Sequence, residues 1–122
     1  MMLKPSPKTG LSHLIASTGY SLAGLRRLWQ ETSFRQEVLV GGAGLLTLLL
    51  AGASLHSIAV FGMLLLALLA VEALNTAIEV IVDHLSPEWS EFAKHAKDIG
   101  SAAVMLMIGV NVIWFSITLM GL

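Results

Sequence analysis

Apolar residues recur along this chain first at helical spacing and then in three long runs. The spaced positions lie within residues 9–30 and form one stripe of a helix: Leu11, Leu14, Ile15, Thr18, Leu22, Leu25 and Trp29. Lys8, His13 and Arg27 fall away from that stripe. Basic residues on one side and a tryptophan on the other suit a helix that lies among lipid headgroups, so we predict an interfacial helix. A soluble helix packed on a partner is the alternative.

The three runs predict transmembrane helices, over residues 36–55, 57–84 and 96–121. A helix needs about 17 to 25 predominantly apolar residues to cross the hydrocarbon core, and each run is long enough. The first run contains Gly41, Gly42 and Gly44, which would weaken a helix in water but allow close helix packing in lipid. No internal repeat or second domain is visible. We therefore expect an all-α integral membrane protein with a single domain.

The composition agrees with a chain that is solvated mostly by lipid. Hydrophobic residues make up 56% of it and charged residues 12%, whereas a typical soluble domain is about a quarter charged. The formal net charge of -1 gives no basic field that would attract nucleic acid, so we expect no nucleic-acid partner. The absence of cysteine excludes disulfides, a catalytic thiolate and sulfur-bound metals.

Positive charges are distributed unevenly between the segments that flank the runs. They precede the first run and occupy the connection between the second and the third: Lys4, Lys8, Arg26, Arg27, Arg35, Lys94 and Lys97. The connection around residues 53–57 has none. The positive-inside rule therefore predicts a cytoplasmic N-terminus and a cytoplasmic second connection. We do not expect a signal peptide, because no apolar run directly follows the first ten residues.

Five polar residues share one face of the second run. At 100° per residue they fall within roughly a 100° arc of an ideal helix: Glu72, Asn75, Thr76, Glu79 and Asp83. A carboxylate in hydrocarbon costs about 2.5 to 3.5 kcal/mol on insertion scales, so a coherent polar face there indicates a functional site. The alternative is a network of satisfied polar groups between packed helices.

The carboxylates of this face suit two different tasks. Glu79 lies about 10 Å closer to the cytoplasm than Glu72, and beside another carboxylate such as Glu31 it suits Mg²⁺, which takes oxygen ligands. The deeper Glu72, away from water, suits a general base for a hydroxyl presented from the bilayer. Lys97 and Asp98 stand at the entry of the third run, where an ammonium reaches phosphate oxygens, although such a pair is commonly a solvated cap. The chain has neither a P-loop nor a glycine-rich kinase loop, so spacing alone leaves the reaction open.

Four segments carry a resemblance to a known family. They read Gly-Tyr-Ser at 19–21, Phe-Arg-Gln-Glu at 34–37, Val-Glu-Ala-Leu-Asn-Thr-Ala-Ile-Glu at 71–79 and Ala-Lys-Asp-Ile-Gly-Ser-Ala-Ala-Val at 96–104. In residues, order and spacing, nearly the whole chain resembles the prokaryotic diacylglycerol kinase family. The resemblance implies a homotrimer of the bacterial inner membrane, with sites between protomers. It also implies transfer of the γ-phosphate of MgATP to diacylglycerol, which yields phosphatidic acid.

The resemblance further implies roles for individual residues, carried over by motif. Glu72 would be the general base, supported by Asn75, and Glu31 and Glu79 would ligate Mg²⁺. ATP would contact Tyr20, Glu31, Glu79, Glu88, Lys97 and Asp98. The lipid substrate would contact Ser21, Arg26, Trp29, Phe34, Arg35, Gln36, Glu37, Glu72 and Ser101. The chain departs from the family pattern at His13, Leu22, Trp89, Ser90 and His95, and the tract between Trp29 and Phe34 is one residue shorter.

Two other functions stay open. Undecaprenol kinases share the implied fold and carboxylates, but Gly-Ser-Ala-Ala at 100–103 favours the diacylglycerol branch. A non-enzymatic ion-conducting oligomer would also place carboxylates on one face within the membrane. Against this function, the polar residues of the second run are confined to its cytoplasmic half. The deeper polar residues Asn111, Ser116 and Thr118 are expected to form hydrogen bonds between helices.

Overall fold

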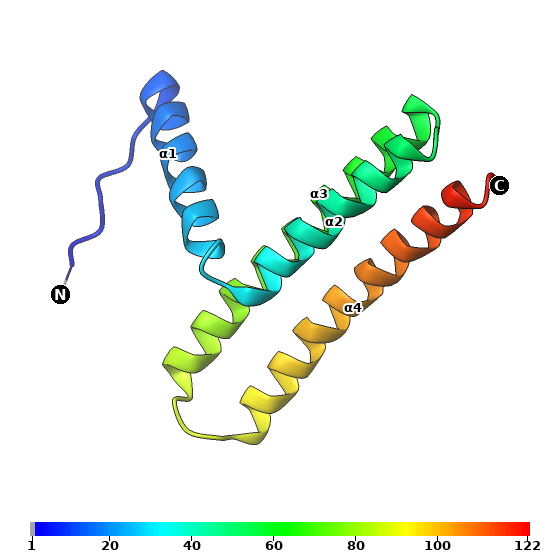
Figure 1. The fold of residues 1–122 in the computed structure, drawn as a ribbon. Coiled ribbons are helices and arrows are strands. Elements are labelled where there is room, and N and C mark those ends of the chain that lie inside the picture. Colours follow the sequence, from blue (N-terminus) through cyan, green and yellow to red (C-terminus); the bar gives the residue numbers. More distant parts are fainter. Residues whose placement is uncertain (1) are drawn as a thin grey trace.

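The computed structural model describes residues 2–122, which fold entirely into helices and short connections. The elements are α1 (Gly10–Leu28), α2 (Thr32–Leu50), α3 (Leu55–Leu85) and α4 (Glu91–Leu119). Short connections make α2, α3 and α4 run up and down beside one another, while α1 projects away from them (Figure 1). The last three helices are each long and apolar enough to cross a membrane, which confirms the prediction of an all-α chain with three such helices.

The helices begin and end a few residues away from the predicted bounds. α2 begins at Thr32 rather than at residue 36, and α4 begins at Glu91 rather than at residue 96. Their first turns are polar, so the length of the apolar runs does not include them. Ser90 caps α4, because its Oγ accepts a hydrogen bond from the Ala93 amide at 3.3 Å.

The turn between α2 and α3 is set by Gly52. Its φ of +79° is the left-handed conformation that favours glycine, and α2 consequently ends at Leu50 rather than at residue 55. The Ala53 amide donates to the Leu48 carbonyl at 3.0 Å and the Gly52 amide to the Leu49 carbonyl at 3.2 Å, which is a Schellman motif.

Small residues bring α2 close to its neighbours, as predicted for two of the three glycines. A Cβ on Gly41 would overlap the Leu65 side chain, and one on Gly44 would lie 3.1 Å from the ring of Phe61. A Cβ on Gly42 would meet no atom within 4 Å in this chain, so Gly42 plays no part in this contact. The buried core lies between α3 and α4, where Leu65 and Val104 belong to one cluster.

Hydrogen bonds between side chains and backbone join α3 to α4 in the apolar half of the bundle. Asn111 Nδ2 donates to the Leu64 carbonyl at 3.0 Å, and Trp114 Nε1 donates to the Ser57 carbonyl at 3.0 Å. The prediction for Asn111 is therefore confirmed. Within residues 2–122 the Ser116 and Thr118 side chains form no such bond, so that part of the prediction is wrong for the single chain.

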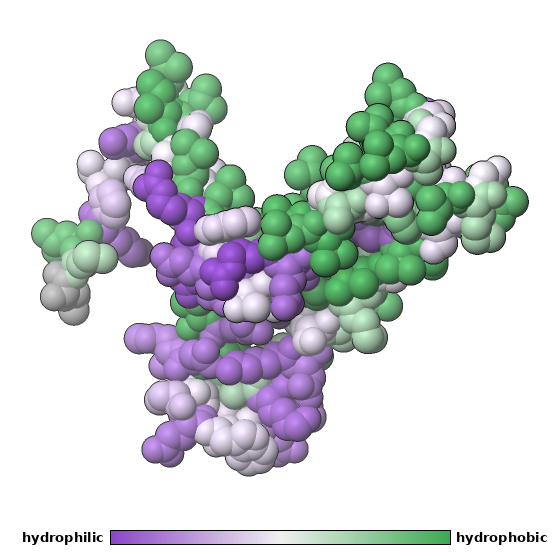
Figure 2. All heavy atoms as spheres, viewed as in Figure 1, coloured by the Kyte–Doolittle hydropathy of each residue, from purple (hydrophilic) through white to green (hydrophobic). Residues whose placement is uncertain are grey.

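Charged residues are concentrated at one end of the molecule. Figure 2 shows hydrophilic residues around the α3–α4 turn and the start of α2, whereas the α2–α3 turn and the C-terminal end of α4 are hydrophobic. The apolar stripe of α1 stays uncovered: Leu11, Leu14, Ile15, Leu22 and Leu25 are all more than half exposed. This uncovered stripe needs lipid or another chain to cover it.

Candidate functional site

A cavity of about 350 Å³ lies where α2, α3 and α4 meet, at the hydrophilic end of the molecule. Its lining comes from the start of α2, the polar face of α3 and about two turns of α4: Glu31, Ser33, Gln36, Glu37, Glu72, Asn75, Glu79, Ser101, Val104 and Ile108. We call it the carboxylate cavity, because four glutamates line it.

The polar face of α3 supplies the floor of this cavity. Glu72 is only 5% exposed and Asn75 8% exposed, whereas Glu79 is half-buried. Glu72 is thus more withdrawn from solvent than Glu79, in the order that their depth along the helix predicts. Thr76 does not line the cavity, and its hydroxyl donates to the Glu72 carbonyl of its own helix at 3.0 Å. Asp83 is exposed and lies beyond the cavity, toward the α3–α4 turn.

The carboxylate cavity is strongly acidic. Within the described chain no lysine or arginine lines it, and Arg27 reaches it only through its ion pair with Glu31, at 2.7 Å. Asn75 Nδ2 donates to Glu79 Oε1 at 3.4 Å. Four carboxyl groups with so few donors require added positive charge, as bound cations or protons.

The donor set of the cavity fits Mg²⁺. No three acidic or histidine side chains of residues 2–122 are grouped as a complete metal cage. Mg²⁺ does not need such a cage, since it is commonly held by one or two carboxylates and completes its shell with waters and substrate phosphates. Glu31 and Glu79, which were predicted as ligands, line the same cavity.

A second polar cavity, of about 290 Å³, lies at the α3–α4 turn, and we call it the turn cavity. Lys97 Nζ lies 2.5 Å from Asp83 Oδ1, and Lys94 Nζ lies 2.6 Å from Asp98 Oδ2. All four side chains line the cavity together with Glu88. The predicted ATP contacts are therefore divided between two places, with Glu88, Lys97 and Asp98 here and Glu31 and Glu79 in the carboxylate cavity.

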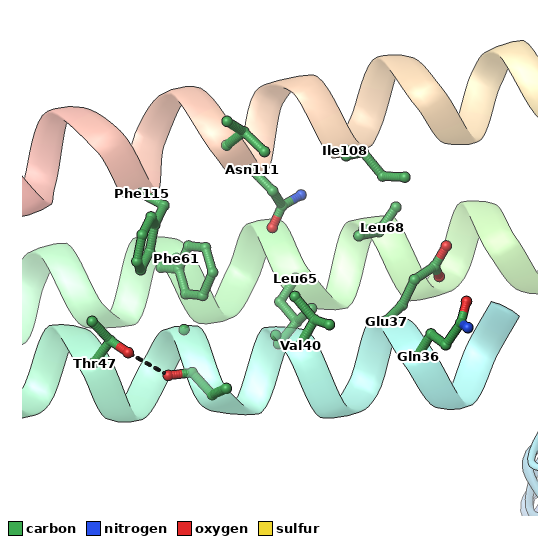
Figure 3. Close-up of a pocket in the computed structure, with 14 residues that line it drawn as sticks. Gln36, Glu37, Val40, Thr47, Phe61, Leu65, Leu68, Ile108, Asn111 and Phe115 are labelled. Carbon is green, nitrogen blue, oxygen red and sulfur yellow. Dashed lines mark hydrogen bonds between the residues drawn. The ribbon is translucent and has the colours of Figure 1, made fainter.

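An apolar crevice of about 450 Å³ extends from the carboxylate cavity between α2, α3 and α4 (Figure 3). The two share Gln36, Glu37 and Ile108 in their linings, so the crevice and the cavity adjoin. The crevice reaches the aromatic pair Phe61 and Phe115, whose ring centroids are 5.7 Å apart.

The predicted lipid-contacting residues fall into two groups. Gln36, Glu37, Glu72 and Ser101 line the carboxylate cavity. The others lie on α1 or at its junction with α2: Ser21, Arg26, Trp29, Phe34 and Arg35. At the junction the rings of Trp29 and Phe34 pack edge to face at 6.5 Å, and Arg35 Nη1 donates to the Trp29 carbonyl at 3.0 Å. Tyr20, predicted to contact ATP, is 62% exposed on α1 and lines neither cavity.

Comparisons with known proteins agree with one another. The profile of the prokaryotic diacylglycerol kinase family matches residues 19–119. A diacylglycerol kinase of Sinorhizobium is 43% identical over 104 residues, which covers 85% of this chain and 76% of that protein. The diacylglycerol kinase of Escherichia coli K12 is 40% identical over 91% of this chain and 92% of its own length. That of Pseudomonas aeruginosa is 37% identical over 98% of this chain and its whole length.

This chain belongs to the prokaryotic diacylglycerol kinase family. The resemblance read from the sequence motifs is thereby confirmed, and the protein is an enzyme of the kinase class. The matched residues include α2, α3 and α4 and the residues that line both polar cavities. The part of the chain that matches this family of membrane-lipid kinases thus contains all three helices of membrane-spanning length.

Sequence reasoning missed several residues that the diacylglycerol kinase fold brings to these sites. Ser33, Val104 and Ile108 complete the carboxylate cavity. In the turn cavity, Asp83 and Lys94 pair with two predicted ATP contacts. The sequence pattern did indicate Asp83 as a candidate, since it lies on the polar arc of α3. The apolar crevice had none beyond the glycines of α2, because its wall is made by residues from three helices.

Proposed function

We propose that this enzyme transfers the γ-phosphate of MgATP to the free hydroxyl of diacylglycerol and releases phosphatidic acid and ADP. The observation that carries the proposal is the junction between the carboxylate cavity and the apolar crevice. Such a junction suits a substrate with a polar head and an apolar tail. The family membership and the names of the related diacylglycerol kinases support diacylglycerol as that substrate.

Glu72 is the proposed general base. It is the most buried carboxylate of the cavity, and the hydroxyl of a lipid whose tail enters the crevice approaches it from the membrane side. The hydroxyl oxygen forms a bond to the γ-phosphorus while the bond to the bridging oxygen of ADP breaks, and Glu72 accepts the hydroxyl proton. Asn75, one turn away, supports the carboxylates of the site.

Glu31 and Glu79 would hold Mg²⁺ in the proposed complex. When bound, Mg²⁺ supplies positive charge to phosphate oxygens in the transition state. The two glutamates are less buried than Glu72, and Glu79 lies closer along α3 to the α3–α4 turn than Glu72 does. Lys97 would neutralise phosphate charge from the turn cavity, where Glu88 and Asp98 would also contact ATP. Tyr20, which lines neither polar cavity, would complete the proposed ATP contacts from α1.

The proposed assembly is a homotrimer in the bacterial inner membrane. The single chain leaves large apolar surfaces uncovered on every helix, which lipid and neighbouring protomers would cover. The N-terminus and the α3–α4 turn would face the cytoplasm, because they carry the lysines and arginines. In the same arrangement α1 would lie in the interface, with Ser21, Arg26, Trp29, Phe34 and Arg35 beside the lipid substrate.

The direct test is γ-phosphate transfer by the purified protein in mixed micelles, with dioleoylglycerol and with undecaprenol as acceptors. Wild-type protein is expected to phosphorylate the diacylglycerol faster, and Glu72→Gln is expected to lose transfer while its trimer and its nucleotide binding persist. Glu91→Gln is the matched control, since the Glu91 side chain is 85% exposed on α4 and lines no described cavity.

Each other outcome of this test rejects a defined part of the proposal. Faster phosphorylation of undecaprenol would make the protein an undecaprenol kinase of the same fold. Transfer at the wild-type rate by Glu72→Gln would reject Glu72 as the base. No transfer to either lipid by a folded, Mg²⁺-supplied protein would favour an ion-conducting oligomer.

A further inference from the structure

Gly100 of α4 packs directly against the Asn75 carboxamide of α3. A Cβ placed on Gly100 would overlap Asn75 Oδ1, and its next contacts would be Asn75 Cγ at 3.2 Å and Asn75 Cβ at 4.0 Å. Both residues are buried. The α4 backbone thus leaves room for this side chain only because residue 100 has no Cβ.

The orientation of the carboxamide is fixed from its other end. Asn75 Nδ2 donates to Glu79 Oε1, so Oδ1 faces α4. The opposite orientation would place Oδ1 against the Glu79 carboxylate, and two acceptors would then repel each other. Oδ1 is fully buried, and no hydrogen-bond donor of residues 2–122 reaches it.

A buried, unpartnered acceptor destabilises a fold, so a structural role alone does not explain why Asn75 is held in this way. Its amide group is the side-chain donor to Glu79, in a cavity that no lysine or arginine lines within the described residues. A shift of the amide would therefore change the position of the Glu79 carboxylate, which lies at the more exposed side of the cavity.

We infer that Gly100 is a positioning residue, which seats the Asn75 carboxamide so that it holds Glu79 in place for Mg²⁺. This inference rests on the proposed function for the identity of the cation. The contact between Gly100 and Asn75 does not depend on that function. Gly100 acts through Asn75 and touches no reacting atom. Nothing larger than glycine fits at residue 100 while Asn75 keeps its orientation.

The test is a double-mutant cycle with Gly100→Ala and Asn75→Ala, measured by the Mg²⁺ concentration for half-maximal transfer and by thermal unfolding. Gly100→Ala alone is expected to raise the Mg²⁺ requirement and to lower kcat, by up to about a hundred-fold, the loss that a misplacement of about 1 Å can produce. In the Asn75→Ala background, Gly100→Ala is expected to have no further effect, because the shortened side chain leaves room for the methyl group.

Gly109→Ala is the matched control. It makes the same change on the same helix, where a Cβ would meet no atom within 4 Å, and it should leave the Mg²⁺ requirement unchanged. If the effects of Gly100→Ala and Asn75→Ala on the Mg²⁺ requirement multiply independently, or if Gly100→Ala behaves like Gly109→Ala, the inference is wrong.

A folding failure of Gly100→Ala is also informative. Recovery of a folded protein on addition of Asn75→Ala would support the contact, and failure of the double variant to fold would overturn it. If wild-type protein transfers no phosphate, the proposed function fails. The thermal unfolding cycle then still decides whether Gly100 seats Asn75, because the two substitutions couple only if their side chains meet.

Discussion

Lys97 and Asp83 form an ion pair across the α3–α4 turn, with Nζ 2.5 Å from Oδ1. Asp83 lies on the polar arc of α3 and Lys97 in the second turn of α4, so the pair joins the two helices beside the turn cavity. Both side chains are partly exposed, at 42% for Lys97 and 62% for Asp83. An exposed pair of this kind contributes little to stability, which leaves Lys97 free to exchange Asp83 for a phosphate oxygen.

This exchange predicts an asymmetry between the two partners. Lys97→Met should lower kcat/KM for MgATP by about ten-fold or more, because a charge-assisted bond to phosphate is worth about 1.5 to 3 kcal/mol. Asp83→Asn should change it by less than about five-fold, the effect of losing an exposed pair of up to about 1 kcal/mol. Steady-state kinetics at varied MgATP would measure both, with Glu91→Gln, which removes a charge outside both polar cavities, as the control. Equal losses from Lys97→Met and Asp83→Asn would mean that the ion pair itself is needed.

The paired glutamates of the carboxylate cavity predict a specific metal dependence. Glu31→Gln and Glu79→Gln should each raise the Mg²⁺ concentration for half-maximal transfer, by about ten- to a hundred-fold, since a ligand carboxylate loses its charge. Titration of free Mg²⁺ at saturating ATP and lipid would measure the shift, with Glu91→Gln unchanged. A variant that lost kcat at every Mg²⁺ concentration, with no shift in the midpoint, would contradict the role of that glutamate as a ligand.

Much of this architecture could be predicted from the sequence, because one physical constraint dominates it. Lipid requires long apolar helices, so the spans were visible in hydropathy alone, and an intramembrane carboxylate such as Glu72 is costly enough to stand out as a site residue. The first turns of α2 and α4 were missed, because apolar runs report the thickness of the hydrocarbon and not where a helix begins.

The parts that could not be predicted depend on how the helices cross. The contact between Gly100 and Asn75 joins residues on two helices. The sequence pattern of either helix alone does not indicate that these two residues meet. The ion pair of Lys97 with Asp83 depends on the α3–α4 turn, which the periodicity of a single helix does not specify. The roles given to Tyr20, Ser21 and Arg26 stay predictions, since α1 projects away from the other helices (Figure 1) and none of the three residues lines a polar cavity.

Gly52 adopts the left-handed conformation between α2 and α3, so we predict that its replacement lowers stability without affecting catalysis. Gly52→Ala should destabilise the protein by about 1 to 2 kcal/mol, because an alanine in the left-handed conformation is strained. Gly52 lies at the opposite end of the helix bundle from the carboxylate cavity, so KM for ATP and for lipid should stay at the wild-type values. Thermal unfolding in micelles would measure the loss. An unchanged unfolding temperature would show that the turn adopts another conformation.

The apolar crevice predicts how acyl-chain length affects transfer. Gln36 and Thr47 both line it, and their separation of eleven positions along α2 spans about 16 Å, which is roughly half the thickness of the hydrocarbon core. The crevice is therefore about as long as an acyl chain of one leaflet. Figure 3 shows Phe61 and Phe115 together at the end away from Glu37, where they would limit the depth that a chain can reach.

Ala43 lines the middle of this crevice, so Ala43→Phe should shorten the space for an acyl chain. We expect kcat/KM to fall by about ten-fold for dioleoylglycerol, because burial of about two methylene groups at about 0.8 kcal/mol each is lost, and to change little for dihexanoylglycerol. The KM for ATP should not change. Leu39→Phe is the control, since Leu39 is 65% exposed on the same helix and lines no described cavity. An equal loss for both lipids would mean that the crevice does not hold the chain, whereas a selective loss for the longer lipid would establish α2 as the wall that measures it.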